Sequence, residues 1–417
     1  MFIERGITPY LRHLLGLDVA RCILLTGARQ TGKTTLLRRE FPSFAYYSFD
    51  EPLEREAILR RPSRWWLTQG SRFIFDEVQK APDFFGTIKA MIDNGPPALR
   101  IILSGSAQIR LMTRIRESLA GRAVRVELFP FHTVELSRGE ARLLRAMLSG
   151  EQRSGIAGWL THLSHLSPGD PRLLAVQEAQ EQLLGLGGMP PVHILSTVEE
   201  KWLWLKEYCG TYLQRDLMDL GRIADLDNFL RLERLAAIRS GGIINYADMA
   251  RDADISAVTA KRYINYLEIS YHCFLLRAFR RRRKERLIKA SKLYFTDLGI
   301  QRVLSGLKTG LTGEQFETYV ISEIIKFLAI LNSEAQGFYL RTKDGREVDL
   351  LLQTEQGYWA MEIKHSRNPG PRAARHLRGL ETYLDGPLLG GFVVTSGGWI
   401  KELGSDVWMI PAWALWY

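Results

Sequence analysis

The stretch from Gly27 to Thr34 has the residue types and spacing of a phosphate-binding loop, because it fits G-x-x-x-x-G-K-[ST] at every fixed position. An apolar run precedes it and good helix formers follow it, so backbone N–H groups at a helix N-terminus would face an anion. We expect Lys33 to reach the β- and γ-phosphates of ATP and the Thr34 hydroxyl to bind Mg²⁺. The predicted nucleotide-binding residues are Gly27, Ala28, Arg29, Gln30, Thr31, Gly32, Lys33, Thr34 and Thr35.

Two carboxylates suited to the same chemistry follow an apolar run, and the first of them, Asp76, lies 43 residues after Lys33. Asp76 would hold the Mg²⁺ through water, and Glu77 would orient or deprotonate the water that attacks the γ-phosphate. The alternative is a solvated acidic pair at the end of a strand.

Two further polar groups are candidates for contacts to the γ-phosphate. A third apolar run ends in Ser104 and Ser106, either of which suits a polar sensor, with an ordinary helix cap as the alternative. Arg122 is either an arginine finger that acts on a neighbouring subunit's nucleotide or a surface side chain.

The elements that must position these residues alternate along residues 1–140. Strand-like runs at 22–25, 45–49, 73–75 and 101–103 are separated by helical stretches, which predicts a parallel sheet covered on both faces. Ligands of such sheets bind at the carboxyl ends of the strands, where the phosphate-binding loop, the pair Asp76 and Glu77, and the serines Ser104 and Ser106 fall. Residues 141–226 are predicted to be helical and to form a lid over the nucleotide.

The positive charge of the chain is concentrated in one segment. The formal net charge is +10, and residues 277–292 contain nine basic side chains against the single acidic residue Glu285. This concentration indicates a polyanionic partner.

Residues 227–305 have the pattern of a winged helix-turn-helix, with capping residues at Asn245 and Ser256. The side chains of its second helix expected to face the core are Val258, Tyr263 or Ile264, and Leu267. The side chains predicted to contact DNA are Thr259, Lys261, Arg262, Arg280, Arg281, Arg282, Arg283 and Lys284. A domain-joining module with a solvated basic hairpin is the alternative.

Residues 306–417 are predicted to fold in the order αβββαβ, with the second helix near 372–384. This part of the chain contains carboxylates and a lysine that could form another site. Glu362 and Lys364 share one face of a strand, and Asp349 can join them across a hairpin. With Glu317 as a third acidic group, these residues would bind a divalent metal, with Lys364 orienting a nucleophilic water. A cross-strand salt bridge is the alternative.

Other features of the sequence restrict the class of protein. The three cysteines are far apart, which excludes a disulfide framework and a zinc site and fits a reducing cytoplasm. Neither a signal peptide nor a membrane span is predicted.

Nearly the whole chain resembles a family of prokaryotic AAA-type ATPases with a C-terminal domain of unknown function that is similar to PD-(D/E)xK nucleases. The resemblance implies ATP hydrolysis assisted by Asp76 and Glu77, and a nuclease-like metal site at Glu317, Asp349, Glu362 and Lys364, although Val348 replaces the proline of the nuclease motif. The segments that carry it are Gly27 to Thr35, Phe73 to Glu77, Leu103 to Ser106, Ser118 to Arg122, Gly187 to Pro190, Tyr212 to Asp216, Lys292 to Gly299, Phe316 to Lys326, Glu347 to Leu351 and Met361 to Ser366.

The predicted architecture is therefore an α/β P-loop NTPase core of the AAA type (1–140), a helical lid (141–226), a winged-helix domain (227–305) and a restriction-endonuclease-like α/β domain (306–417). The leading hypothesis is an ATP-hydrolysing, DNA-associated protein that drives or gates a nuclease-like module. The second is a nucleotide-dependent switch whose C-terminal domain is catalytically inactive and binds a protein partner or mediates oligomerisation. The expected partners are ATP or ADP, DNA and further copies of the same chain.

Overall fold

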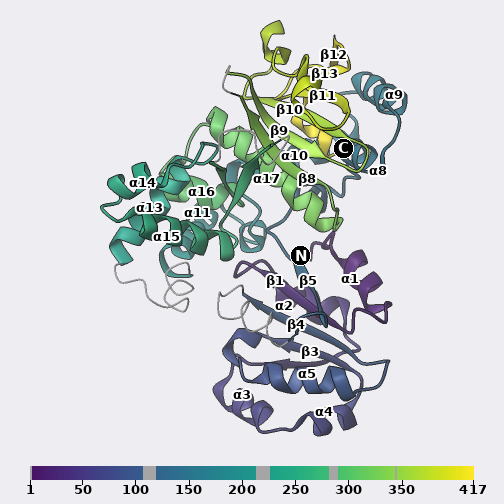
Figure 1. Cartoon of the computed structure of the whole chain (residues 1–417), viewed down its shortest axis with the longest axis vertical. Coiled ribbons are helices and arrows are strands. Elements are labelled where there is room, and N and C mark those ends of the chain that lie inside the picture. Colours follow the sequence, from purple (N-terminus) through teal and green to yellow (C-terminus); the bar gives the residue numbers. More distant parts are fainter. Residues whose placement is uncertain (1, 107–118, 213–225, 281–289, 343–344) are drawn as a thin grey trace.

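The computed structural model describes residues 2–106, 119–212, 226–280, 290–342 and 345–417. These residues form an N-terminal α/β body, a middle helical body and a C-terminal body built on a second sheet (Figure 1). Within the described residues, no helix has the length and apolar character needed to cross a membrane.

The N-terminal body is a five-stranded parallel sheet in the order β2-β3-β4-β1-β5. The interior strand β1 is buried along its whole length, as expected for a strand covered on both faces. Separate apolar clusters pack on the two faces of the sheet. The strands are β1 (Cys22–Gly27), β2 (Ala45–Ser48), β3 (Arg72–Asp76), β4 (Arg100–Ser106) and β5 (Ala123–Glu127), and the helices are α1 (Thr8–Leu15), α2 (Lys33–Glu40), α3 (Pro52–Leu59), α4 (Ser63–Gln69) and α5 (Phe84–Asn94), with the 3-10 turn η1 (Val78–Lys80).

The middle body places three helices before an antiparallel strand pair. Asn245 caps the second helix and Ser256 the third through side-chain hydrogen bonds to backbone N–H groups, as predicted. Val258 was wrongly predicted to face the core, because its side chain is 80% exposed and Ala260, Tyr263 and Ile264 fill that place. The elements are α13 (Leu226–Ile238), α14 (Tyr246–Asp252), α15 (Ala257–Ile269), β6 (Cys273–Ala278) and β7 (Lys292–Phe295), covered by α10 (Pro171–Leu186), η2 (Pro190–His193), α11 (Val198–Glu207), the π-helical turn η3 (Tyr208–Tyr212) and α16 (Leu298–Ser305).

The C-terminal body continues the same β6/β7 pair, because β6 also pairs with β8 and extends the sheet to eight strands in the order β12-β13-β11-β10-β9-β8-β6-β7. The two bodies therefore share one sheet instead of being separated by a linker. The helix predicted near 372–384 is replaced by two 3-10 turns, η4 (Pro371–Ala374) and η5 (Leu380–Tyr383). The other elements are α17 (Gly313–Ile330), β8 (Gln336–Arg341), β9 (Glu347–Gln353), β10 (Tyr358–Lys364), β11 (Leu388–Thr395), β12 (Lys401–Gly404), β13 (Val407–Pro411) and η6 (Ala412–Leu415).

The predicted lid does not form one body over the phosphate-binding loop. Helices α8 (Arg142–Ser149) and α9 (Arg153–Ser164), which follow α7 (Thr133–Ser137), share an apolar core with the C-terminal sheet and lie beside it in Figure 1. The indole of Trp359 on β10 donates to the carbonyl of Met147 on α8 at 3.2 Å. Burial of the apolar face of α8 against the C-terminal residues therefore determines where this segment packs.

A buried carboxylate in the middle body predicts a pH-dependent stability. Burial raises the pKa of Glu233 on α13 from its ordinary value of 4.5 to about 8. Between these two pH values the unfolded chain releases the proton while the folded chain keeps it, so stability falls as pH rises, by up to ~1.4 kcal/mol per pH unit. We expect Glu233→Gln to remove this part of the slope in urea unfolding curves between pH 5 and 8. The exposed residue Glu199 provides the control Glu199→Gln, and an unchanged slope in Glu233→Gln would contradict the assignment.

Candidate functional site

The phosphate-binding loop connects β1 to α2, at the carboxyl end of the parallel sheet. Gly27 is required because a Cβ there would lie 2.2 Å from the carbonyl oxygen of Leu128, and Gly32 has a φ of +89°, which favours glycine. Lys33 is only 6% exposed, and its Nζ donates to the carbonyl oxygens of Gly27 at 3.1 Å and Ala28 at 2.7 Å. The lysine ammonium is thus held inside the loop, where the predicted phosphates would lie.

The predicted magnesium ligands are brought together at the same end of the sheet. Asp76 ends β3, and its Oδ2 accepts hydrogen bonds from the hydroxyls of Thr34 at 2.6 Å and Tyr46 at 2.7 Å. A hydroxyl and a carboxylate in contact beside a phosphate-binding loop are the oxygen donors that Mg²⁺ prefers, so the residues fit a nucleotide-bound Mg²⁺.

Glu77 and Ser106 are joined by one amide side chain. The Gln79 amide donates to the Glu77 carboxylate and, at 3.1 Å, to the Ser106 hydroxyl. Burial raises the pKa of Glu77, although the charge of Lys33 opposes this shift. Ser106 pairs with Gly27 in the sheet, whereas Ser104 lies two residues further from the loop, beside Leu25. Ser106 is therefore the serine positioned beside the loop.

Arg122 lies on the surface and forms an ion pair with Asp93 at the end of α5, with Nε 2.7 Å from Oδ1. The hydrogen bond from this guanidinium lowers the pKa of Asp93. Within one chain, the surface alternative describes Arg122.

Arg5 is a contact to the loop that sequence analysis missed, because no motif marks it. It is buried, and it donates from Nη1 to the carbonyl of Thr31 at 2.8 Å and from Nη2 to that of Phe129 at 2.6 Å. Its Nε pairs with the Glu135 carboxylate at 2.9 Å. Arg5 thus fixes the phosphate-binding loop to the segment that leaves the N-terminal body.

Tyr271, directly after α15, is a second contact that was missed. Its hydroxyl lies 2.6 Å from the Thr26 hydroxyl on β1, accepts from Arg125 at 2.7 Å and donates to Glu127 at 3.1 Å. Burial raises the pKa of Tyr271 to about 12, so the hydroxyl keeps its proton. The middle body therefore contacts the residue that precedes the first glycine of the loop.

Two of the segments that carry the family resemblance, Gly187 to Pro190 and Lys292 to Gly299, are in contact in the structure. The Asp297 carboxylate caps α16 by accepting from Ile300 N at 3.1 Å, and it also accepts from Gly188 N at 2.6 Å. A Cβ on Gly299 would lie 2.1 Å from the carbonyl oxygen of Leu186. This contact explains the two segments through packing, without a catalytic role.

The structure describes four of the eight residues predicted to contact DNA. Lys261 and Arg262 are exposed on α15, Thr259 is half-buried near its start, and Arg280 is exposed at the end of β6. Arg277 and Arg280 line a hollow of about 520 Å³ whose other walls include Phe338 on β8 and Tyr358 on β10. The other predicted DNA contacts lie outside the described residues; they are Arg281, Arg282, Arg283 and Lys284. Most of the segment from Tyr212 to Asp216 also lies outside the described residues.

The C-terminal residues predicted to bind metal surround one open pocket of about 590 Å³. Lys364 Nζ lies 2.7 Å from Glu362 Oε1, and Asp349 Oδ2 accepts from the backbone N–H of Ile363 at 2.8 Å. Burial, with the charge of Asp349, raises the pKa of Glu317 and of Glu362 well above the ordinary value. The spacing argument thus brought the four predicted residues to one pocket.

Lys292 on β7 is a member of this pocket that sequence analysis missed, because it was counted with the basic segment and with a segment of the resemblance but not with the C-terminal carboxylates. Its Nζ lies 3.1 Å from Glu317, 3.1 Å from Glu347 and 3.6 Å from Asp349. Burial lowers the pKa of Lys292, but these carboxylates raise it more. In the described part of the chain, no three acidic, histidine or cysteine side chains converge to hold a metal ion, so this pocket as arranged does not fit the predicted metal.

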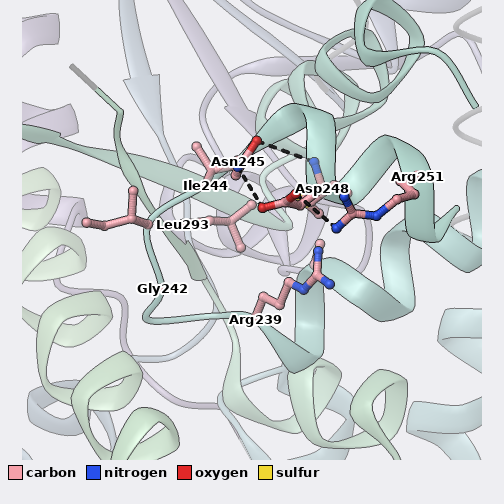
Figure 2. A pocket seen from close by; sticks show the side chains of 10 residues that line it. Arg239, Gly242, Ile244, Asn245, Asp248, Arg251 and Leu293 are labelled. Carbon is pink, nitrogen blue, oxygen red and sulfur yellow. Dashed lines mark hydrogen bonds and ion pairs between the residues drawn. The ribbon is translucent and has the colours of Figure 1, made fainter. Parts of the chain in front are cut away.

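A smaller hollow of about 320 Å³ lies in the middle body, beside the N-terminus of α14 (Figure 2). Its two arginines are already paired, Arg239 with Asp252 and Arg251 with Asp248 at 3.0 Å. Because their charges are neutralised, this hollow gives no reason to expect an anion.

Comparisons with known proteins agree with the division into three parts. Residues 20–137 match the model of an AAA domain, and residues 177–310 and 312–415 match two domains of unknown function. An uncharacterized protein of Mycobacterium tuberculosis is 27% identical over 378 residues, which cover 88% of this chain and 76% of that protein. An uncharacterized protein of Methanocaldococcus jannaschii is 23% identical over 344 residues, which cover 79% and 71%.

Among solved structures, a Walker-type ATPase of Pyrococcus abyssi aligns with a TM-score of 0.41 and 17% identity, over 73% of this chain and 96% of that one. The fold of the N-terminal body rests on its own strand order and on the site at the carboxyl ends of its strands. The parallel sheet, the loop from Gly27 to Thr34 and the match over residues 20–137 identify this body as a P-loop ATPase domain of the AAA type.

Proposed function

We propose that the protein hydrolyses ATP and uses the nucleotide state to change how its middle and C-terminal bodies engage DNA. The observation that carries hydrolysis is the contact of Thr34 with Asp76 beside Lys33 and Glu77. A bound Mg²⁺ would be held by Thr34 and Asp76 and would neutralise charge on the β- and γ-phosphates.

In this mechanism Lys33 exchanges its carbonyl acceptors in the loop for phosphate oxygens, and Glu77 accepts a proton from the attacking water. Its raised pKa brings Glu77 closer to the ideal for such a base. Ser106 contacts the γ-phosphate, and Gln79 keeps Ser106 and Glu77 at a fixed separation. Arg122 would act only on the nucleotide of a second subunit, after leaving Asp93.

DNA association is proposed through the middle body as a winged helix. It is supported by the helix–helix–hairpin order, by exposed Lys261, Arg262 and Arg280, and by the basic segment that follows. The Tyr271 hydroxyl links this body to β1, and β1 leads directly into the phosphate-binding loop. The three cysteines are unpaired and buried, which supports a reducing cytoplasm as the place of action.

The test of coupling is the ATPase rate with and without single-stranded, duplex and junction DNA. We expect stimulation of about fivefold or more by at least one DNA form in the wild type. Tyr271→Phe should lose that stimulation while its rate without DNA stays within about fivefold, because it removes three hydrogen bonds but keeps the ring. Tyr266→Phe, on the helix α15 that precedes Tyr271, is the matched control. The coupling is rejected if no DNA form changes the wild-type rate or if Tyr271→Phe responds as the control does.

A second candidate function is a nucleotide-dependent switch whose C-terminal body binds a partner without cleaving DNA. It is favoured by the position of the Lys292 ammonium among the carboxylates of the C-terminal pocket. A Mg²⁺-dependent nick in DNA that is lost in Asp349→Ala and Lys364→Ala would reject it in favour of a nuclease-like module.

A further inference from the structure

The acidic pocket of the C-terminal body contains a positive charge that belongs to the chain itself. The Lys292 Nζ lies within 3.1 Å of Glu317 Oε1 and of Glu347 Oε1 and 3.6 Å from Asp349 Oδ1, and the residue is only 3% exposed. Divalent cations take oxygen ligands at about 2.0–2.6 Å, so a metal shared by these carboxylates would need the space that the ammonium fills.

The backbone of Lys292 is fixed by strand pairing on both sides. Lys292 faces Leu276 in the β6/β7 pair and forms a bridge with Ile243 on its other side. The ammonium is therefore delivered by a strand of the continuous sheet and not by a free loop end. Other side chains of the chain also contact the carboxylates of this pocket. The Tyr294 hydroxyl donates to Glu317 at 2.6 Å, and the Lys364 ammonium pairs with Glu362 at 2.7 Å.

We propose that Lys292 is the resident cation of this pocket and that its ammonium keeps divalent metal ions out of the carboxylate cluster. The lysine takes the position that the nuclease-like interpretation gives to a metal. Removing its charge leaves Glu317, Glu347 and Asp349 without their counter-ion, and we expect these carboxylates to move together around a divalent cation that replaces it.

The test uses Mn²⁺ as the only added ligand, with nucleotide omitted so that the result is independent of ATP hydrolysis. Free Mn²⁺ is measured by electron paramagnetic resonance during titration of the full chain. We expect Lys292→Met to bind one Mn²⁺ at least about tenfold more tightly than the wild type. The double variant Lys292→Met/Asp349→Asn should lose that binding. Lys401→Met, at an exposed lysine on β12, should behave like the wild type.

Thermal unfolding gives a second measurement, which can be made even if Lys292→Met is less stable than the wild type, because each variant is compared with itself with and without Mn²⁺. Mn²⁺ should raise the midpoint of Lys292→Met and leave the wild-type midpoint unchanged. The proposal is overturned if the wild type binds Mn²⁺ in a way that Asp349→Asn abolishes, or if Mn²⁺ neither binds nor stabilises Lys292→Met.

Discussion

Replacing Lys33 with Ala is expected to lower kcat/KM for ATP by at least about 100-fold, because the loop loses the ammonium that its phosphate-binding motif places against the β- and γ-phosphates. The ammonium is buried and held by the carbonyls of Gly27 and Ala28, so it is already positioned for a phosphate. Release of inorganic phosphate with Mg²⁺ and ATP measures the effect. The control Lys89→Ala changes an exposed lysine on α5 and should keep the wild-type rate.

Glu77→Gln separates binding from chemistry at the same site. Gln keeps the shape of the side chain but cannot accept a proton from water, so kcat should fall by about 100-fold or more while ATP still binds. Lys33→Ala should lower kcat and also weaken the binding of ATP. Measurement of bound nucleotide by equilibrium dialysis distinguishes the two variants. Full turnover in either variant would show that hydrolysis takes place elsewhere in the chain.

The N-terminal body was largely predictable because its signals are local. The glycines and Lys33 of the loop follow one strand, and Asp76 and Glu77 end another, so each group is fixed by a few neighbouring residues. Parallel strands then bring these ends together, which needs no knowledge of side-chain packing. The predicted parallel sheet is confirmed, and Thr34 and Asp76 are in contact, as their proposed shared role requires.

The contacts between bodies were not predictable from local signals. Arg5 meets Glu135, and Tyr271 meets Thr26, across 130 and 245 residues of sequence. No periodicity or spacing encodes such pairs, because they depend on how complete bodies pack. Helices α8 and α9 show the same limit, since their apolar faces predict burial but not the surface that buries them.

The C-terminal pocket combines both situations. The two-residue alternation of a strand correctly placed Glu362 and Lys364 at one pocket with Asp349. Lys292 belongs to a strand that joins this sheet from the middle body, so its position depends on the sheet order, which the sequence does not reveal. A basic residue inside a basic segment also gave no sign that it is buried among carboxylates.

Glu323→Ala is expected to lower the free energy of unfolding by about 3–5 kcal/mol, which is the largest stability effect that we expect from a single substitution in this chain. Glu323 on α17 is 1% exposed, and its Oε2 accepts from the backbone N–H and the hydroxyl of Thr133, both at 2.7 Å. Its Oε1 pairs with the buried Lys326 ammonium at 2.9 Å. The substitution would leave all three donors in the core without this acceptor.

The midpoint of urea unfolding measures this effect, and Glu334→Ala at an exposed position just after α17 is the control, expected to stay within about 0.5 kcal/mol of the wild type. Equal midpoints for the two variants would contradict the role assigned to Glu323. His132 is also in contact, with Nε2 donating to the Glu323 carbonyl at 3.0 Å, and its backbone N–H donates to Glu135. Since Glu135 holds Arg5, and Arg5 holds the loop at Thr31, Glu323 stabilises the connection between the ATPase domain and the helix that carries Glu317.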